Sequence, residues 1–230
     1  MAGQMVEFAS NGGTDQGYLA TPAGGSGPGV LVIQEYWGLV PHIKDVCDRF
    51  AAAGFVALAP DLFHGAETRE PDEAGKLMMA LNIAQAARDL RGAAVYLKSL
   101  PAVTSQRLGI VGFCMGGQLA LYAASVAPEI GPVADFYGGH PNVSVDLTHV
   151  TGPVLGNFGG QDDFMTPEAV RQLDADLTAH GIPHDFKTYP DAGHAFFNDA
   201  RANEPEPPYR AGDARDAWDR TIAFFRQHVR

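Results

Sequence analysis

Short, almost wholly apolar runs alternate with longer segments of helical periodicity along most of this 230-residue chain. The apolar runs cover 29–34, 55–61, 107–113, 132–138 and 152–159, and the more polar segment 184–190 is predicted as a last strand. Helical patterns cover 42–54, 72–99 with a break near Asn82, 115–127, 166–181 and 212–229. Strands that are apolar on both faces and alternate with helices are typical of a mostly parallel sheet with helices on both sides. The sequence therefore predicts an α/β fold.

The start of the chain predicts a different local arrangement. Two segments, QMVEFA and QGYLAT, flank the turn-forming sequence NGGTD, which indicates an antiparallel hairpin at one edge of the sheet. We find no internal repeat and no long linker, so residues 1–230 are predicted to form a single domain. The Pro-rich segment 202–212 is predicted to be a surface loop rather than a domain boundary.

Charge and cysteine content exclude several classes of function. The chain has 16 basic and 27 acidic residues and a net charge of −11, which argues against nucleic acid or an anionic membrane as a partner. No secretory leader and no apolar run of membrane-spanning length are apparent. Cys47 and Cys114 are too few for a disulfide framework, and without a CxxC pair a structural zinc site is not expected. We expect a cytoplasmic protein that needs no metal or cofactor.

The sequence GFCMGG at 112–117 lies between a predicted strand and a predicted helix. It lacks the GxxxxGK of a phosphate-binding loop and the GxGxxG of a dinucleotide fingerprint. The pattern G-x-C-x-G instead matches the nucleophile elbow of α/β-hydrolases, with Cys114 in place of serine. Gly112 and Gly116 would leave room for the strained turn, and Gly117 would let the helix pack closely. The helix N-terminus would favour a Cys114 thiolate.

The alternative for either cysteine is a role as a small buried apolar side chain. Cys47 fits that alternative, because it shares a predicted helix face with Val46 and Phe50. For Cys114 the elbow predicts further residues downstream, in the order nucleophile, acid, histidine.

Both partners occur in that order after later predicted strands. Asp162 and Asp163 follow the strand that ends near 159, and His194 follows the strand 184–190. The carboxyl ends of successive parallel strands meet at one edge of the sheet, where such folds place their sites. His64 and His140 also follow strands and could line the same cleft, but a lone loop histidine is more often solvated.

These motifs together resemble the dienelactone hydrolase family, the carboxymethylenebutenolidase-like proteins of the α/β-hydrolase superfamily. The resemblance runs from about residue 16 to 228 and includes VIQEYWGL (32–39), APDLFHG (59–65), GFCMGG (112–117), GGQDDFMTPE (159–168) and AGHAFFND (192–199). It implies a triad of Cys114, Asp162 and His194, with Asp163 as the alternative acid. It also implies an α/β-hydrolase fold and hydrolysis of a small-molecule ester or lactone through a thioester.

The resemblance assigns roles around the triad as well. Glu35 would sit beside the resting thiol and keep it protonated until substrate displaces it. A carboxylate that follows a buried strand does need a partner or a task, although a purely local pairing is the alternative. The N–H groups of Tyr36 and Met115 would form the oxyanion hole. An aromatic pocket would be lined by Tyr36, Trp37, Phe63 and Phe196, for which plain core packing is the alternative.

The sequence departs from the family where a substrate carboxylate would be held. Family members that process dienelactones use an arginine four residues after the catalytic histidine, and Asn198 stands there. The region of a second family arginine, 70–78, contains none, and Arg69 and Arg201 are near but not at matching positions. A broad-specificity esterase or thioesterase, or a promiscuous phosphotriesterase, is therefore one alternative. A non-catalytic thiol redox sensor is another.

Overall fold

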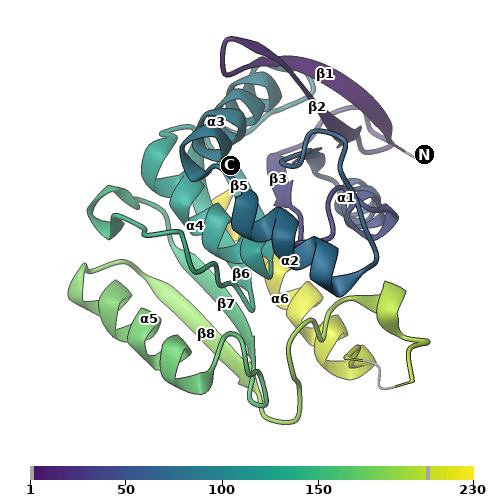
Figure 1. The fold of residues 1–230 in the computed structure, drawn as a ribbon. Coiled ribbons are helices and arrows are strands. Elements are labelled where there is room, and N and C mark those ends of the chain that lie inside the picture. Colours follow the sequence, from purple (N-terminus) through teal and green to yellow (C-terminus); the bar gives the residue numbers. More distant parts are fainter. Residues whose placement is uncertain (1–2, 206–207) are drawn as a thin grey trace.

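Eight strands within the described part of the chain form a single twisted sheet. The computed structural model describes residues 3–205 and 208–230 (Figure 1). The strands are β1 (Gln4–Ser10), β2 (Gly13–Ala20), β3 (Gly29–Ile33), β4 (Val56–Pro60), β5 (Leu108–Phe113), β6 (Ile130–Phe136), β7 (Val154–Gly159) and β8 (His184–Tyr189). Their order across the sheet is β1-β2-β4-β3-β5-β6-β7-β8.

The pairing of the strands confirms the predicted parallel core and antiparallel edge. Strands β3 to β8 pair with their neighbours in parallel, whereas β1–β2 and β2–β4 are antiparallel. Asn11 and Gly12 connect β1 to β2 with φ values of 51° and 78°. Two consecutive residues with positive φ give the turn whose twist matches that of a hairpin, and Asn-Gly is the dipeptide that most readily adopts it.

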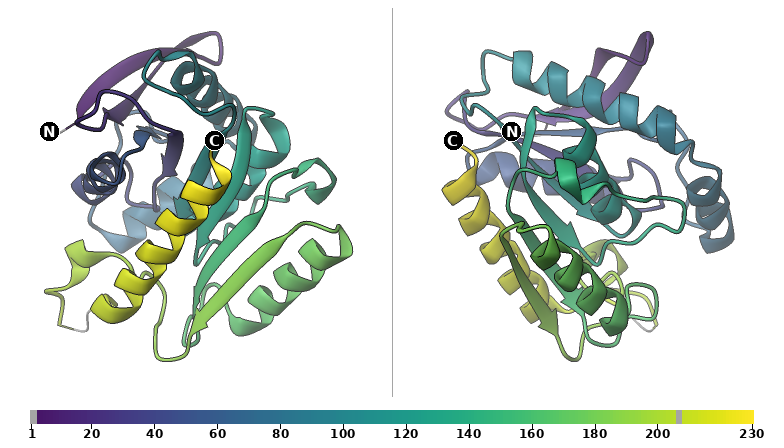
Figure 2. Two further views of the ribbon diagram at one scale, coloured as in Figure 1. Left: turned by 180° about the vertical axis from the view of Figure 1, so that it is seen from behind. Right: turned by 90° about the vertical axis from the view of Figure 1, so that its left-hand side faces the viewer.

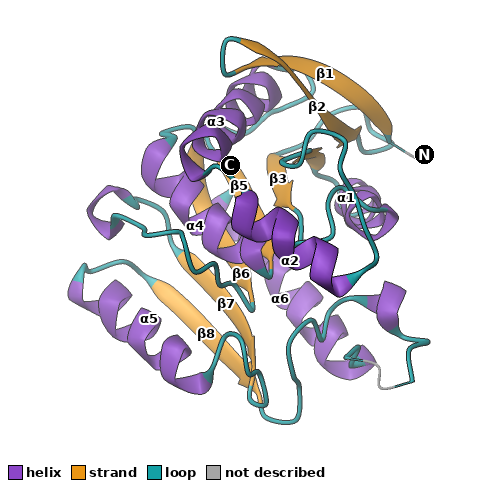
Figure 3. Cartoon of the chain, viewed as in Figure 1, coloured by secondary structure: helices purple, strands orange, loops and turns teal. Residues whose placement is uncertain are grey.

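Helices cover both faces of the sheet (Figures 2 and 3). They are α1 (Pro41–Ala52), α2 (Pro71–Ala80), α3 (Ile83–Ser99), α4 (Met115–Val126), α5 (Pro167–Ala179) and α6 (Ala211–His228). One core layer contains Phe50 of α1 and Phe225 of α6, and α6 crosses in front of the sheet when it is seen from behind (Figure 2). The opposite layer contains Leu90 of α3 and Leu119 of α4. The central strands are buried on both faces, which explains their continuous apolar sequences.

The helix ends follow the local signals of the sequence. The pattern at 72–99 is two helices, because Asn82 accepts a hydrogen bond from the Gln85 N–H and caps α3. Thr166 likewise accepts from the Ala169 N–H at the start of α5. The predicted loop 202–212 includes 206–207, which lie outside the described residues, and α6 begins at Ala211. None of the described helices combines the length and the apolar character needed to cross a membrane.

Candidate active site

Four loops at the carboxyl ends of the parallel strands meet above the centre of the sheet. They follow β3, β5, β7 and β8 and carry Glu35, Cys114, Asp162 and His194, respectively. Strand β3 pairs with β5 (Ile33 opposite Gly112), although the chain passes through β4 on the other side of β3 before it returns. This reversal of strand order opens the crevice in which open α/β sheets bind their ligands.

Cys114 occupies a strained turn between β5 and α4. Its φ of 54° and ψ of −126° lie in a region that non-glycine residues rarely adopt. The two flanking glycines are required by space: a Cβ on Gly112 would overlap the Gly116 carbonyl, and one on Gly116 would overlap the Gln34 carbonyl. A Cβ on Gly117 would overlap the Asp135 carboxylate. The turn thus brings the sulfur to the N-terminus of α4, with the residue 6% exposed.

His194 lies between the thiol and one of the two candidate acids. Its Nδ1 is 2.8 Å from Oδ2 of Asp162, which leaves the other ring nitrogen for the side of Cys114. Oδ1 of Asp162 accepts hydrogen bonds from the N–H groups of Phe164 (2.8 Å) and Met165 (2.9 Å). Asp163 borders the same cavity but makes no contact of this kind with His194. The structure therefore brings Asp162, and not its neighbour, to the imidazole.

The surroundings of His194 favour its charged form. Burial lowers the pKa of the ring, but hydrogen bonds to Asp162 and to the Cys114 thiol outweigh burial and raise the pKa to about 10. The rings of Tyr137 and Phe164 meet His194 edge-on at centroid distances of 5.0 and 5.2 Å. The Cys114 side chain is among the causes of this rise in pKa, so an imidazole that has taken up the thiol proton retains it while the sulfur carries the negative charge.

Glu35 is buried next to this group and is held from two sides. The residue is 1% exposed. Oε2 accepts a hydrogen bond of 2.5 Å from Nδ2 of Asn198, and Oε1 accepts one of 3.3 Å from the Tyr137 hydroxyl. Both partners are neutral, so these contacts satisfy the buried Glu35 carboxylate by hydrogen bonds and not by an ion pair. Asn198, at the position where the family has an arginine, here acts as a hydrogen-bond donor to Glu35.

A cavity of about 320 Å³ opens over the thiol, a volume at the lower end of small-molecule sites. Polar and aromatic side chains line it: Glu35, Tyr36, Trp37, Met78, Cys114, Gln161, Asp163, Phe164, His194, Ala195 and Arg201. Tyr36 and Trp37 pack with ring centroids 4.3 Å apart. In the described residues the N–H groups of Tyr36 and Met115 have no intramolecular acceptor, so both are free to bind an oxygen. We call this cavity the thiol pocket.

Two of the predicted pocket aromatics lie elsewhere. Phe196 is fully buried in the core, where its ring packs on Tyr137 at 5.4 Å and on Tyr189 at 5.0 Å. Phe63 belongs to the core layer under α3 and α4. Neither lines the thiol pocket, because the path of each loop turns its aromatic side chain inwards. His64 and His140 are also absent from its lining.

Two lining residues of the thiol pocket, Phe164 and Arg201, and Tyr137 beside it were not among the residues predicted for the site. Tyr137 directly follows β6 with a φ of 44° and donates its hydroxyl to Glu35, and its place near the end of the predicted strand 132–138 was the available signal. Phe164 follows the aspartate pair and meets the His194 ring edge-on. Arg201 enters the pocket from the short helix Asp199–Arg201, close to Trp37 (Cζ to ring centroid 5.8 Å). Arg201 was set aside because it does not match the family's arginine position.

The strand order and the three side chains on the loops after β5, β7 and β8 define an α/β-hydrolase fold. Within this class the chain belongs to the dienelactone hydrolase family, whose model matches residues 16–229.

Individual relatives agree over the full length of the chain. "Protein usf" of Aquifex pyrophilus is 36% identical over 234 residues, with 99% of both chains covered. A "Putative carboxymethylenebutenolidase" of Aquifex aeolicus is 33% identical over 235 residues and covers 99% of this chain and 100% of its own. The crystal structure of a "Putative Dienelactone Hydrolase" from Klebsiella pneumoniae matches with a TM-score of 0.86 and 30% identity, over 99% of this chain and 100% of that one.

Proposed function

We propose that this protein hydrolyses small carboxylic esters or lactones with Cys114 as the nucleophile. His194 accepts the thiol proton, and the thiolate sulfur attacks the substrate carbonyl carbon. The tetrahedral intermediate then expels the alkoxide, which takes the proton from His194. A thioester remains on Cys114. A water molecule, deprotonated by His194, attacks this thioester and releases the acid, while the proton returns to the sulfur.

The observation that carries this proposal is the placement of His194. One ring nitrogen is 2.8 Å from Asp162, and His194 lines the same cavity as Cys114, whose side chain is among the causes that raise the pKa of the ring. A buried structural cysteine needs no oriented base, and a redox-sensing thiol would not need the aspartate behind that base. The strained backbone of Cys114 supports the same conclusion, because strain of this kind is typical of nucleophile turns.

The oxyanion hole consists of the N–H groups of Tyr36 and Met115 in this proposal. Both donors lack an internal acceptor in the described chain, and Met115 is the first residue of α4, where the helix dipole favours a negative charge. One such donor contributes about 3–4 kcal/mol to transition-state stabilisation in hydrolases. The rest of the rate acceleration would come from the nucleophile, its base and the positioning of the substrate.

Glu35 is proposed to control the resting thiol. It borders the thiol pocket together with Cys114, so its negative charge opposes the formation of a thiolate when no substrate is present. The neutral donors Asn198 and Tyr137 leave this charge in place. Substrate binding would have to displace or screen the carboxylate before attack.

The charges of the thiol pocket favour a neutral acyl group over a carboxylate-bearing one. Arg201 is already paired with Glu204 through two contacts of 2.7 Å, and Glu35 and Asp163 add negative charge to the lining. A carboxylate on the substrate would share Arg201 with Glu204 and would be repelled by Glu35 and Asp163. We therefore propose neutral esters or lactones as the preferred substrates.

The test compares the two cysteines, since Cys47 offers a matched control. Cys47 is fully buried in the core and does not line the thiol pocket. The rate of nitrophenyl ester hydrolysis should fall by at least about 10⁴-fold in Cys114→Ala, and Cys47→Ala should retain the wild-type rate. Full activity in Cys114→Ala would overturn the proposal. Absence of turnover of any ester or lactone by the wild type, with ready oxidation of Cys114, would support the redox sensor instead.

A further inference from the structure

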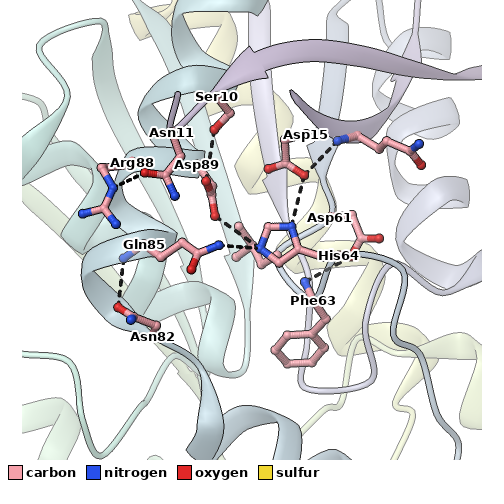
Figure 4. Close-up of polar contacts among 12 residues, drawn as sticks. Ser10, Asn11, Asp15, Asp61, Phe63, His64, Asn82, Gln85, Arg88 and Asp89 are labelled. Atoms are coloured by element: carbon pink, nitrogen blue, oxygen red, sulfur yellow. Dashed lines mark hydrogen bonds and ion pairs between the residues drawn. The ribbon is translucent and has the colours of Figure 1, made fainter. Parts of the chain in front are cut away.

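A second group of ionisable side chains lies away from the thiol pocket, where the edge hairpin meets α3. Asp15 belongs to β2, His64 to the loop after β4, and Asp89 to α3 (Figure 4). We call these three residues the hairpin cluster. None of them lines the thiol pocket, and nothing in the proposed hydrolysis uses them.

The three side chains converge from separate elements. Nδ1 of His64 is 3.5 Å from Oδ1 of Asp15, and Nε2 is 3.5 Å from Oδ2 of Asp89. One ligand-type atom from each residue can be chosen so that all three lie within 4.8 Å of one another. Both aspartates are buried, at 5% and 2% exposure, whereas the His64 side chain is 47% exposed and gives access from solvent.

The carboxylates of the hairpin cluster lack sufficient partners. Oδ2 of Asp15 is buried and has no hydrogen-bond donor among the described residues, and the Asp15 carboxyl group points toward the His64 ring (Figure 4). Its Oδ1 accepts the Gln16 N–H at 2.8 Å, and Asp89 accepts the Ser10 hydroxyl at 3.1 Å. In the described chain no lysine or arginine forms an ion pair with either aspartate. A buried polar atom left in this state is costly, so the cluster is short of positive charge.

The loop that carries His64 is built to hold the imidazole in place. His64 has a φ of 50°, a left-handed conformation that few residues with a side chain adopt. Asp61 fixes this turn, because its carboxylate accepts the N–H groups of Phe63 (3.1 Å) and Gly65 (2.6 Å). Gln85 contacts Nε2 of His64 at 3.1 Å from α3. The ring is therefore oriented by groups that are not themselves part of the cluster.

We propose that Asp15, His64 and Asp89 bind a divalent transition-metal ion, with zinc as the best match. Two carboxylate oxygens and one imidazole nitrogen, completed by water on the exposed side, form a ligand set that suits Zn²⁺. Metal–ligand bonds of about 2.0–2.2 Å in a tetrahedral site place the ligand atoms about 3.3–3.6 Å apart. The three atoms of the hairpin cluster, which lie within 4.8 Å of one another, would therefore have to approach by up to about 1.5 Å. The bound ion would neutralise the buried carboxylates and link β2, the loop after β4 and α3.

The experiment measures zinc binding directly, without reference to activity. Metal-free protein is titrated with Zn²⁺ by calorimetry, in the Cys114→Ser variant so that the thiol pocket offers no thiolate. One equivalent should bind, and the melting temperature should rise with Zn²⁺ concentration, as expected for a ligand of the folded state. His64→Gln and Asp15→Asn should each weaken binding by about tenfold or more, at least the loss seen when outer-shell partners of a metal are removed.

The matched control is His149→Gln. His149 also faces an aspartate, Asp146, at 3.2 Å, but the pair is exposed and has no second acid, so zinc binding should be unchanged. Circular dichroism and the metal-free melting temperature show whether each variant is folded. Equal zinc affinity in His64→Gln and the parent protein would overturn the proposal. So would a parent protein that binds no Zn²⁺ and is stabilised only by acidification, which would make His64 an imidazolium bridge between the two carboxylates.

Discussion

The thiol pocket and the hairpin cluster both place a histidine between two acidic groups, and they differ in what those groups are. In the thiol pocket His194 has the Asp162 carboxylate on one side and, on the other, the Cys114 thiol, which can give up a proton. In the hairpin cluster His64 has a carboxylate on each side. The first arrangement can pass one proton from sulfur to nitrogen, whereas the second has no proton donor of this kind and an excess of negative charge.

The hydrogen bonds behind each carboxylate add to this difference. Asp162 directs one oxygen to His194, and its other oxygen accepts two backbone N–H groups. Asp15 has one oxygen without any donor in the described residues. A fully bonded carboxylate is stable as an anion and can orient a base, while an under-bonded one gains from a cation. Similar residues thus suit acid–base chemistry in one place and ion binding in the other.

Removing the aspartate behind each histidine gives the largest expected contrast. Asp162→Asn should lower kcat by about 10⁴-fold, as the equivalent change does in a serine triad, because the asparagine holds the ring in the wrong tautomer. Asp89→Asn should leave kcat for the same ester within about twofold, since Asp89 does not line the thiol pocket. Steady-state kinetics of both variants measure the contrast, and Asp163→Asn is the adjacent control. Loss of activity in Asp163→Asn but not in Asp162→Asn would reverse the assignment of the acid.

The pH dependence of stability gives a second contrast of intermediate size. The pKa of His194 is raised from 6.5 to about 10 in the folded protein. The folded state therefore binds an extra proton between these values, and the stability it contributes is complete below pH 6.5 and is lost as the pH rises toward 10. Urea unfolding between pH 6.5 and 10 should show that the free energy of unfolding falls more steeply with pH in the wild type than in His194→Gln.

His64→Gln is the control for this measurement, because it leaves the thiol pocket intact and should keep the wild-type slope. Identical slopes for the wild type and His194→Gln would contradict the ion pair inferred between the imidazole and its acidic neighbours.

The smallest expected effect comes from Asp15 in metal-free protein. Its pKa is raised above 3.8, mainly by burial, so the folded state holds its proton more tightly than the unfolded state. The contribution of Asp15 to the free energy of unfolding therefore falls as the pH rises from 3.8 through the raised pKa. Asp15→Asn keeps the bond to the Gln16 N–H and removes the charge, so near neutral pH it should leave the free energy of unfolding unchanged or raise it by about 0.5–1 kcal/mol. A loss of more than about 1 kcal/mol, within the range of an ordinary destabilising mutation, would show that the carboxylate is already well partnered.

Much of the fold follows from local patterns. The strands could be predicted because parallel strands buried on both faces need continuous apolar sequence, and the edge hairpin because Asn11-Gly12 favours two positive φ values. The elbow was recognisable for a steric reason, since Gly112 and Gly116 lie where a Cβ would meet backbone. Asp162 was preferred over Asp163 by resemblance, and the contact with His194 agrees with that preference.

The remaining features depend on tertiary contacts that carry no local signal. Phe196 lies two residues after His194 and was expected in the pocket, but the loop turns it into the core against Tyr137. Arg201 reaches the pocket from a short helix whose position depends on the fold of the whole loop. The hairpin cluster joins three elements distant in sequence, so no motif or spacing could have identified it.

The most direct test of the central claim is to trap the acyl group. The protein is mixed with a nitrophenyl ester, quenched with acid during turnover, and digested for mass spectrometry. The account predicts the mass of the acyl group on the peptide that contains Cys114, with none on Cys47, and no such adduct in Cys114→Ala. Hydrolysis of the ester with no adduct on Cys114, or with the adduct on another residue, would contradict the thioester mechanism.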